Sequence, residues 1–133
     1  MKKYILIISI LIISSCKNKV NEIAGTYKSA SLDFAEYLKY GTTKDMEGMD
    51  LLLNVNGSYH YDTCGILIDG NWEVKEDSLF LKVDQIRFKS DSINKIRKPE
   101  IRNDFLKYKI EGNTLLGFVN ERKSIRINKL TKE

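Results

Sequence analysis

Short stretches in which hydrophobic residues recur at every second position make up most of the chain. In residues 78–83, for example, Leu79, Leu81 and Val83 follow this spacing. Because successive side chains of a β-strand point to opposite faces, the spacing predicts a strand with one buried face. Similar segments predict further strands at residues 23–30, 49–55, 59–63, 71–75, 85–88, 106–110, 114–119 and 124–130.

Turn-forming residues separate these segments at short intervals. Asn56-Gly57 and Gly112-Asn113 each join two predicted strands, and an Asn-Gly pair favours a type I′ hairpin, in which both central residues need positive φ. Glu76-Asp77 joins a third pair. Eight or nine short strands joined in this way predict an all-β fold. We expect a single small antiparallel up-and-down sheet, closed into a barrel that leaves no edge strand.

Two segments interrupt the strand pattern. Residues 33–40 carry apolar residues at helical spacing, and Asp33 and Glu36 are placed as in a capping box. We therefore expect a short helix after the first strand, with a bent strand as the alternative. Residues 89–104 form a long polar segment that contains the only proline, Pro99. Loops longer than about 12 to 15 residues are uncommon unless they are functional or disordered.

The N-terminus has the features of a secretory signal. Lys2 and Lys3 precede a hydrophobic stretch at residues 4–13, which is too short to cross a bilayer because a spanning helix needs about 20 residues. The motif Ile13-Ser14-Ser15-Cys16 follows directly. It resembles the lipobox of bacterial lipoproteins, and the resemblance implies cleavage before Cys16 and acylation of its thiol. An ordinary signal peptide with an incidental cysteine is the alternative.

This resemblance divides the chain into a signal peptide at residues 1–15, an acylated N-terminus and tether at residues 16–22, and one barrel domain at residues 23–133. It implies attachment to a membrane through the acyl chains on Cys16. Lys17 stands where an aspartate favours inner-membrane retention in enterobacterial lipoproteins, and the acidic run of some surface-exported lipoproteins is missing. We therefore expect a lipid-anchored envelope protein in the outer membrane, facing the periplasm.

The composition agrees with one folded domain. Removal of residues 1–15 leaves 118 of the 133 residues, and the full chain is 42% hydrophobic and 30% charged, which suits a single globular domain. Acylation uses one of the two cysteines, so Cys64 is left without an intramolecular partner and the fold depends on packing. The formal net charge of +4 is too small for a surface that coats nucleic acid, so we expect no nucleic-acid partner.

A second resemblance concerns the first strand. Gly25-Thr26-Tyr27 opens the predicted meander and resembles the Gly-x-Trp signature of lipocalin-like lipoproteins, with Tyr27 in place of the tryptophan. A later Gly70-Asn71-Trp72, and Arg126 on the final strand, are also similar to that group. The resemblance implies a barrel with a closed end and, in many members of the group, an internal apolar pocket.

Aromatic residues are spread over most of the predicted strands. We expect most of them to fill the core. The alternative is that a subset lines a cavity, because aromatic walls with a few hydroxyl groups suit a small apolar ligand. The candidates for ligand binding are Tyr27, Tyr59, Tyr61, Trp72 and Phe118.

Residue types that carry catalysis are sparse. The chain has one histidine, His60, and lacks Gly-x-Ser-x-Gly, phosphate-loop and His-Glu-x-x-His motifs, so we expect neither enzymatic activity nor a cofactor. On a strand, His60, Asp62 and Cys64 would share one face and could ligate a metal. Strand spacing places such ligands about 7 Å apart, so we prefer the interpretation that His60 and Asp62 face solvent, and we predict no metal site.

Basic residues are concentrated in one part of the chain. Residues 85–109 carry 8 basic and 3 acidic residues, whereas residues 16–84 carry 7 basic and 12 acidic residues. The basic block coincides with the long polar segment, which is either a solvated loop or a surface for an anionic partner. The candidates for partner binding are Lys95, Arg97, Lys98 and Arg102.

These patterns together favour a binding protein of the cell envelope. In the first hypothesis, the barrel holds a small apolar ligand or acts as an envelope adaptor. In the alternative, the protein is an immunity or inhibitor lipoprotein that neutralises a protein partner through the basic loop at residues 89–104.

Overall fold

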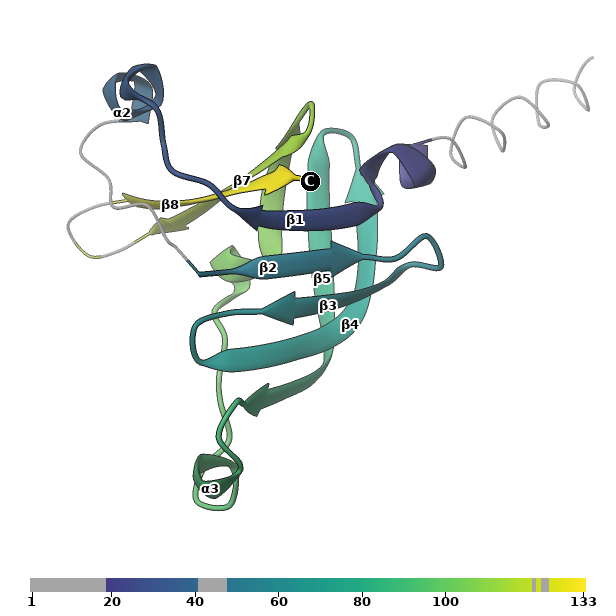
Figure 1. Ribbon diagram of the computed structural model, residues 1–133, viewed down its shortest axis with the longest axis vertical. Helices are drawn as coiled ribbons and strands as arrows, with labels where there is room; N and C mark the ends of the chain where they lie inside the picture. The colour runs from purple at the N-terminus through teal and green to yellow at the C-terminus, as the bar shows by residue number, and fades with distance from the viewer. Residues whose placement is uncertain (1–18, 41–47, 121, 123–124) are drawn as a thin grey trace, which may run out of the picture.

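The barrel expected from the alternating pattern is confirmed. The computed structural model describes residues 19–40, 48–120, 122 and 125–133. Within these residues, eight antiparallel strands pair in chain order, and the first pairs with the last to close the barrel (Figure 1). The strands are β1 (Gly25–Ser29), β2 (Asp50–Leu53), β3 (Ser58–Asp62), β4 (Ile66–Lys75), β5 (Ser78–Phe88), β6 (Lys107–Glu111), β7 (Thr114–Asn120) and β8 (Ile125–Lys132).

A β-bulge explains why there are eight strands and not nine. β5 is continuous through the two segments that the sequence pattern separates, and it pairs with β4 along its length. The register shifts at Asp69/Gly70 of β4, which leaves Asp84 of β5 as an extra residue. The extra residue changes the phase of the alternation within one strand, and this phase change looks like a strand boundary in the sequence.

The hairpins are confirmed, but the Asn-Gly turn differs from the expected type. Gly57 has a φ of 88° and is the only one of the two residues with positive φ. Its amide donates to the carbonyl of Asn54 at 3.0 Å, as in a three-residue loop that ends in a left-handed glycine. At the β6–β7 turn, Gly112 has a φ of 59°.

A short helix follows the first strand, as expected. In α2 (Phe34–Tyr40), the predicted capping box is present: the Asp33 amide donates to Glu36 Oε2, and the Glu36 amide donates to Asp33 Oδ1, both at 2.8 Å. Tyr40 packs edge-on against Phe118 of β7, with 5.5 Å between the ring centroids. α2 therefore lies outside the barrel, against its outer face.

The inward-facing side chains form one core, and a smaller cluster lies on the outer face beneath α2. The inner core contains Tyr27, Leu51, Leu53, Tyr59, Tyr61, Ile68, Trp72, Leu79, Leu81, Tyr108, Leu115 and Leu130. The outer cluster contains Leu32, Leu116 and Ile127, with Tyr40 and Phe118 packed against it. Each strand thus contributes to the inner core through alternate residues, as the sequence pattern predicts.

One end of the barrel is closed by the segment that precedes β1. Residues 19–23 are helical, and Ile23 is buried in the inner core. The Tyr27 hydroxyl donates to the Ile23 carbonyl at 2.7 Å. At the same end, Trp72 Nε1 donates to the Asn54 carbonyl at 2.9 Å, so the tryptophan ties β4 to the β2–β3 turn.

The opposite end lies where β5 finishes at Phe88, which pairs with Ile66 of β4. The chain then forms α3 (Asp91–Asn94) and returns through the 3-10 helix η1 (Asn103–Leu106) to β6 (Figure 1). Residues 99–106, which we call the cover segment, lie against this end: Pro99 is buried, and partly buried apolar residues of the segment pack on the core. The long polar loop of the sequence is therefore largely ordered.

Candidate functional site

Three polar side chains meet in the middle of the barrel. Tyr61 of β3, Tyr108 of β6 and Asn128 of β8 come from strands that lie across the interior from one another. The two hydroxyl oxygens are 2.7 Å apart, and Asn128 Nδ2 donates to them at 2.8 and 2.7 Å. We call this group the central bridge. Because its hydrogen bonds cross the interior, the barrel is filled at this level.

Burial sets the chemistry of the central bridge. It raises the pKa of Tyr108 well above its usual value, and it raises the pKa of Tyr61 despite the opposing effect of hydrogen bonds from Tyr108 and Asn128. Both phenols are therefore neutral at physiological pH. Gly117 leaves the space for one of them, since a Cβ at that position would lie 3.0 Å from the Tyr108 ring.

An apolar pocket of ≈ 250 Å³ lies at the end of the barrel under the cover segment. Its wall includes Met49, whose sulfur accepts a hydrogen bond from the Tyr61 hydroxyl at 3.0 Å, so the central bridge lies beneath the pocket. Exposed Glu100 and Arg102 add charged groups to an otherwise mostly apolar lining. The lining residues are Met49, Thr63, Cys64, Ile66, Glu100, Ile101, Arg102 and Phe105.

The structure brings together four of the five residues that the sequence suggests for ligand binding. Tyr27, Tyr59, Tyr61 and Trp72 are buried in the inner core. Phe118 is separate from them, because it faces outward and belongs to the outer cluster. The four inner aromatics pack around the barrel axis and do not line the apolar pocket at its end.

Sequence reasoning considers two of the residues that line this pocket for other roles, Cys64 as a metal ligand and Arg102 for partner binding, and suggests none of the lining residues for ligand binding. Met49 only begins a predicted strand, and Ile101 and Phe105 are isolated apolar residues in a polar segment without strand or helix periodicity. The sequence feature that could have indicated these lining residues is the presence of several apolar residues after Pro99 in an otherwise charged stretch. Such residues indicate that part of the segment contacts a core.

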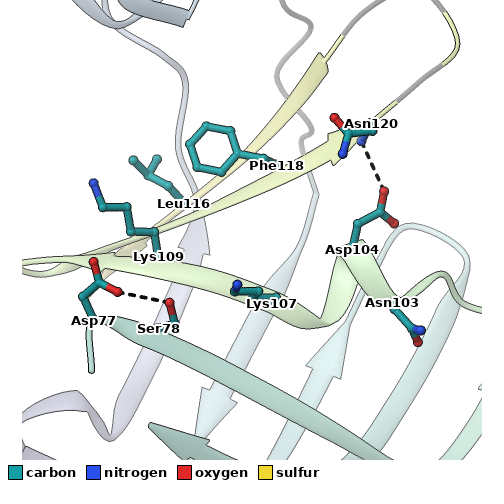
Figure 2. Close-up of a pocket in the computed structure, with 9 residues that line it drawn as sticks. All are labelled: Asp77, Ser78, Asn103, Asp104, Lys107, Lys109, Leu116, Phe118 and Asn120. Carbon is teal, nitrogen blue, oxygen red and sulfur yellow. Dashed lines mark hydrogen bonds between the residues drawn. The ribbon is translucent and has the colours of Figure 1, made fainter. Parts of the chain in front are cut away.

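A larger hollow of ≈ 540 Å³ lies on the outer face of β6 and β7. Figure 2 shows the residues that line it: Asp77, Ser78, Asn103, Asp104, Lys107, Lys109, Leu116, Phe118 and Asn120. Several of its charged groups already have partners. Lys109 pairs with Glu111 at 2.8 Å, and Asp104 accepts hydrogen bonds from Arg102 and from the Asn120 amide. A ligand in this hollow would have to compete with those contacts, so the apolar pocket is the stronger candidate.

The residues considered for a metal site do not converge. His60 Nδ1 lies 2.6 Å from Asp69 Oδ1, and Asp62 Oδ1 lies 2.5 Å from Lys89 Nζ. Cys64 is exposed in the turn between β3 and β4. In the part of the chain that the structure describes, no cluster of three His, Cys, Asp or Glu side chains is arranged to hold a metal ion.

The residues suggested for partner binding fall into two places. Lys95, Arg97 and Lys98 are exposed and follow α3 directly. Arg102 lies in the cover segment, and its guanidinium donates to Asp104 Oδ2 and to the Asn120 carbonyl, both at 2.5 Å. The surface expected from the basic block is therefore limited to the residues next to α3.

Fold and site together define a small closed antiparallel β-barrel with a filled centre and an apolar pocket at one end. None of the helices among the described residues is long and apolar enough to cross a bilayer. Comparisons of the chain with protein-family models, with curated proteins and with solved structures found no match. The functional argument therefore depends on the residues of this chain.

Proposed function

We propose that the protein is a lipid-anchored binding protein of the cell envelope that takes up a small apolar ligand at the covered end of its barrel. The observation that carries the proposal is the apolar pocket of ≈ 250 Å³. Its walls include Met49 of the inner core and Ile66 and Ile101, which pack against that core, so a bound apolar group would extend the core. The closed barrel and the Gly25-Thr26-Tyr27 strand support a lipocalin-like protein.

The volume and lining of the pocket define the class of ligand. The pocket lies below the usual range for ligand sites, about 300 to 1,000 Å³, and admits a group the size of two fused aromatic rings or a short alkyl chain. Burial of about 200 Å² of apolar ligand surface contributes about 5 kcal/mol before the cost of association. We therefore expect weak, exchangeable binding of an apolar molecule whose polar end remains near Glu100 and Arg102.

Filling the pocket should abolish this binding. Cys64 lines the pocket and is exposed, so a larger side chain at this position can enter the pocket without displacing the core. The substitution Cys64→Trp is expected to weaken binding of the neutral fluorophore N-phenyl-1-naphthylamine at least about tenfold, which corresponds to about 1.4 kcal/mol. Fluorescence titration of the purified barrel measures the affinity.

Val55→Trp is the matched control, because Val55 is 67% exposed and lies in the turn at the other end of the barrel. In the unsubstituted protein, the fluorophore should also slow alkylation of the Cys64 thiol by iodoacetamide, since the thiol borders the pocket. Equal affinities in the two tryptophan variants, together with an unchanged alkylation rate, would place the ligand elsewhere.

Membrane attachment is the second part of the proposal. Its basis is the lipobox-like motif that ends at Cys16, which lies outside the described residues. Cys16→Ser is expected to abolish incorporation of labelled palmitate and to move the protein from the membrane fraction to the soluble fraction, because no acyl chain can then be attached. Cys64→Ser, which changes the only other cysteine, should leave both properties unaltered.

The same fractionation tests the expected location. Separation of membranes by density should place the acylated chain in the outer membrane, and protease added to intact cells should not reach it if the barrel faces the periplasm. Palmitate on the Cys16→Ser protein would contradict the assignment of the anchor.

A further inference from the structure

The chain between β5 and the cover segment projects from the barrel. Residues 89–98, which we call the tip, contain α3, and Figure 1 shows α3 well clear of the strands, beyond the end of β5. The tip is connected to the barrel on one side through Phe88 and on the other through the buried Pro99. Its position makes it accessible to a large partner.

Specific contacts hold the tip in one shape. The Asn94 side chain donates to the Phe88 carbonyl and accepts from the Phe88 amide, both at 2.8 Å. The amides of Ile96 and Arg97 both donate to the Ile93 carbonyl at 3.0 Å, and the Arg97 guanidinium lies over the Phe88 ring, 5.0 Å from its centroid. A solvated linker needs none of these contacts. A segment that is already ordered loses less conformational entropy when it binds.

The apex of the tip combines an exposed apolar side chain with a cluster of positive charge. Ile96 is 85% exposed, so binding can remove most of its apolar surface from water. Lys95, Arg97 and Lys98 flank it and are exposed. The positive charge of Lys89, at the base of the tip, is offset by its ion pair with Asp62. Asp91 is the one carboxylate of the tip and lies at the start of α3, so the excess positive charge is at residues 95–98, around Ile96.

We propose that the tip is a docking surface for a protein partner that offers an apolar pocket rimmed by carboxylates. Ile96 fills the pocket, and the cations of Lys95 and Lys98 face the acidic rim, while Arg97 stays over the Phe88 ring. In such an arrangement, the buried apolar anchor provides affinity. The surrounding charges provide specificity and raise the association rate. Arg102 has no part in it, because its guanidinium is bound to Asp104 and to the Asn120 carbonyl.

Position and area favour a protein over a lipid surface. The tip lies at the opposite end of the barrel from residues 19–23. Cys16 precedes residue 19 by three residues, a span of about 10 Å at most, so acyl chains on Cys16 would hold the other end of the barrel against the bilayer. Two exposed isoleucines, Ile93 and Ile96, on and beside a four-residue helix also offer far less apolar area than a helix that binds a membrane interface. This orientation, unlike the geometry of the tip, rests on the proposed acylation.

Photo-crosslinking of the full chain in intact cells tests the proposal. With Ile96→p-benzoylphenylalanine, irradiation is expected to give one discrete protein adduct, in which the crosslinked peptide of the partner is rich in Asp and Glu by mass spectrometry. Adding Lys95→Glu and Lys98→Glu should lower the adduct yield at least about tenfold, because both charges then repel the acidic rim. This pair leaves the Arg97–Phe88 contact in place. Val55→p-benzoylphenylalanine, at the other end of the barrel, is the matched control and should not give this adduct.

Binding of the purified protein to vesicles of phosphatidylglycerol tests the alternative, in which the tip docks on a lipid surface. Binding to these vesicles that depends on Lys95 and Lys98 would overturn the proposal in favour of a lipid surface. An adduct with a second copy of this chain, an adduct that persists after charge reversal, or the absence of any adduct would overturn it as well. The tip variants should still bind N-phenyl-1-naphthylamine, because the apolar pocket uses other residues. Failure of docking can thus be distinguished from failure of the proposed ligand site.

Discussion

Replacement of Gly70 with alanine is expected to destabilise the barrel by about 3 kcal/mol or more. A Cβ at this position would lie 1.9 Å from the Lys82 carbonyl oxygen and 3.0 Å from the ring of Tyr59. The oxygen belongs to the paired backbone of β5, two residues before the bulge at Asp84, and cannot turn aside as a flexible side chain would. The strands must separate at this point, which breaks the ladder that joins β4 to β5.

Two other glycines provide graded controls for Gly70→Ala. At Gly117 a Cβ would meet the Tyr108 ring at 3.0 Å, and at Gly65 it would meet nothing within 4 Å. We expect Gly65→Ala to change the free energy of unfolding by less than about 0.5 kcal/mol, and Gly117→Ala to have an intermediate effect. Urea unfolding, followed by circular dichroism, measures all three. A Gly70→Ala protein as stable as Gly65→Ala would show that β4 and β5 are not paired in this register.

Replacement of Tyr108 with alanine is expected to cost about 3 to 5 kcal/mol of stability. The ring is almost fully buried, at 1% exposure, so its removal leaves a cavity in the middle of the core. It also leaves Asn128 Nδ2 and the Tyr61 hydroxyl with one partner fewer in the central bridge. Tyr108→Phe keeps the ring and removes only the hydroxyl, and should therefore cost about 1 to 3 kcal/mol.

A double-mutant cycle shows whether the two phenols are bonded to each other. Tyr61→Phe and Tyr108→Phe each remove one hydroxyl of the 2.7 Å contact. The double variant should therefore lose less stability than the sum of the two single variants, because the second substitution removes a bond that is already broken. Strictly additive losses would mean that the hydroxyls act independently and that the central bridge does not form as described.

Much of the fold could be predicted because it depends on local pattern. The period of two, the turn residues and the capping box at Asp33 and Glu36 each involve residues close in sequence, and the structure contains all three. The first half of β4, residues 66–70, was not predicted, since Ile66, Leu67 and Ile68 are consecutive apolar residues without alternation. The bulge at Asp84 also escapes local pattern, because it is defined only by the partner strand.

The candidate site was less predictable because it is formed by tertiary contacts. The inner aromatics are visible in the sequence, but whether they enclose a cavity depends on Tyr61, Tyr108 and Asn128 meeting across the barrel. These residues come from strands that are distant in sequence. The pocket needs Ile101 and Phe105 to fold back over Met49, and neither residue has a periodic context that would predict this return. At the tip, the basic residues are evident from composition, whereas the exposure of Ile96 depends on how the chain turns after α3.

The central bridge has a kinetic consequence for whatever enters the pocket. A ligand at the covered end cannot move deeper, because Tyr61, Tyr108 and Asn128 close the interior beneath it. A molecule in this pocket therefore stays within a short distance of solvent, and its entry and exit need no diffusion along an internal channel. For the ligand proposed above, such a shallow site favours rapid exchange over long-term sequestration.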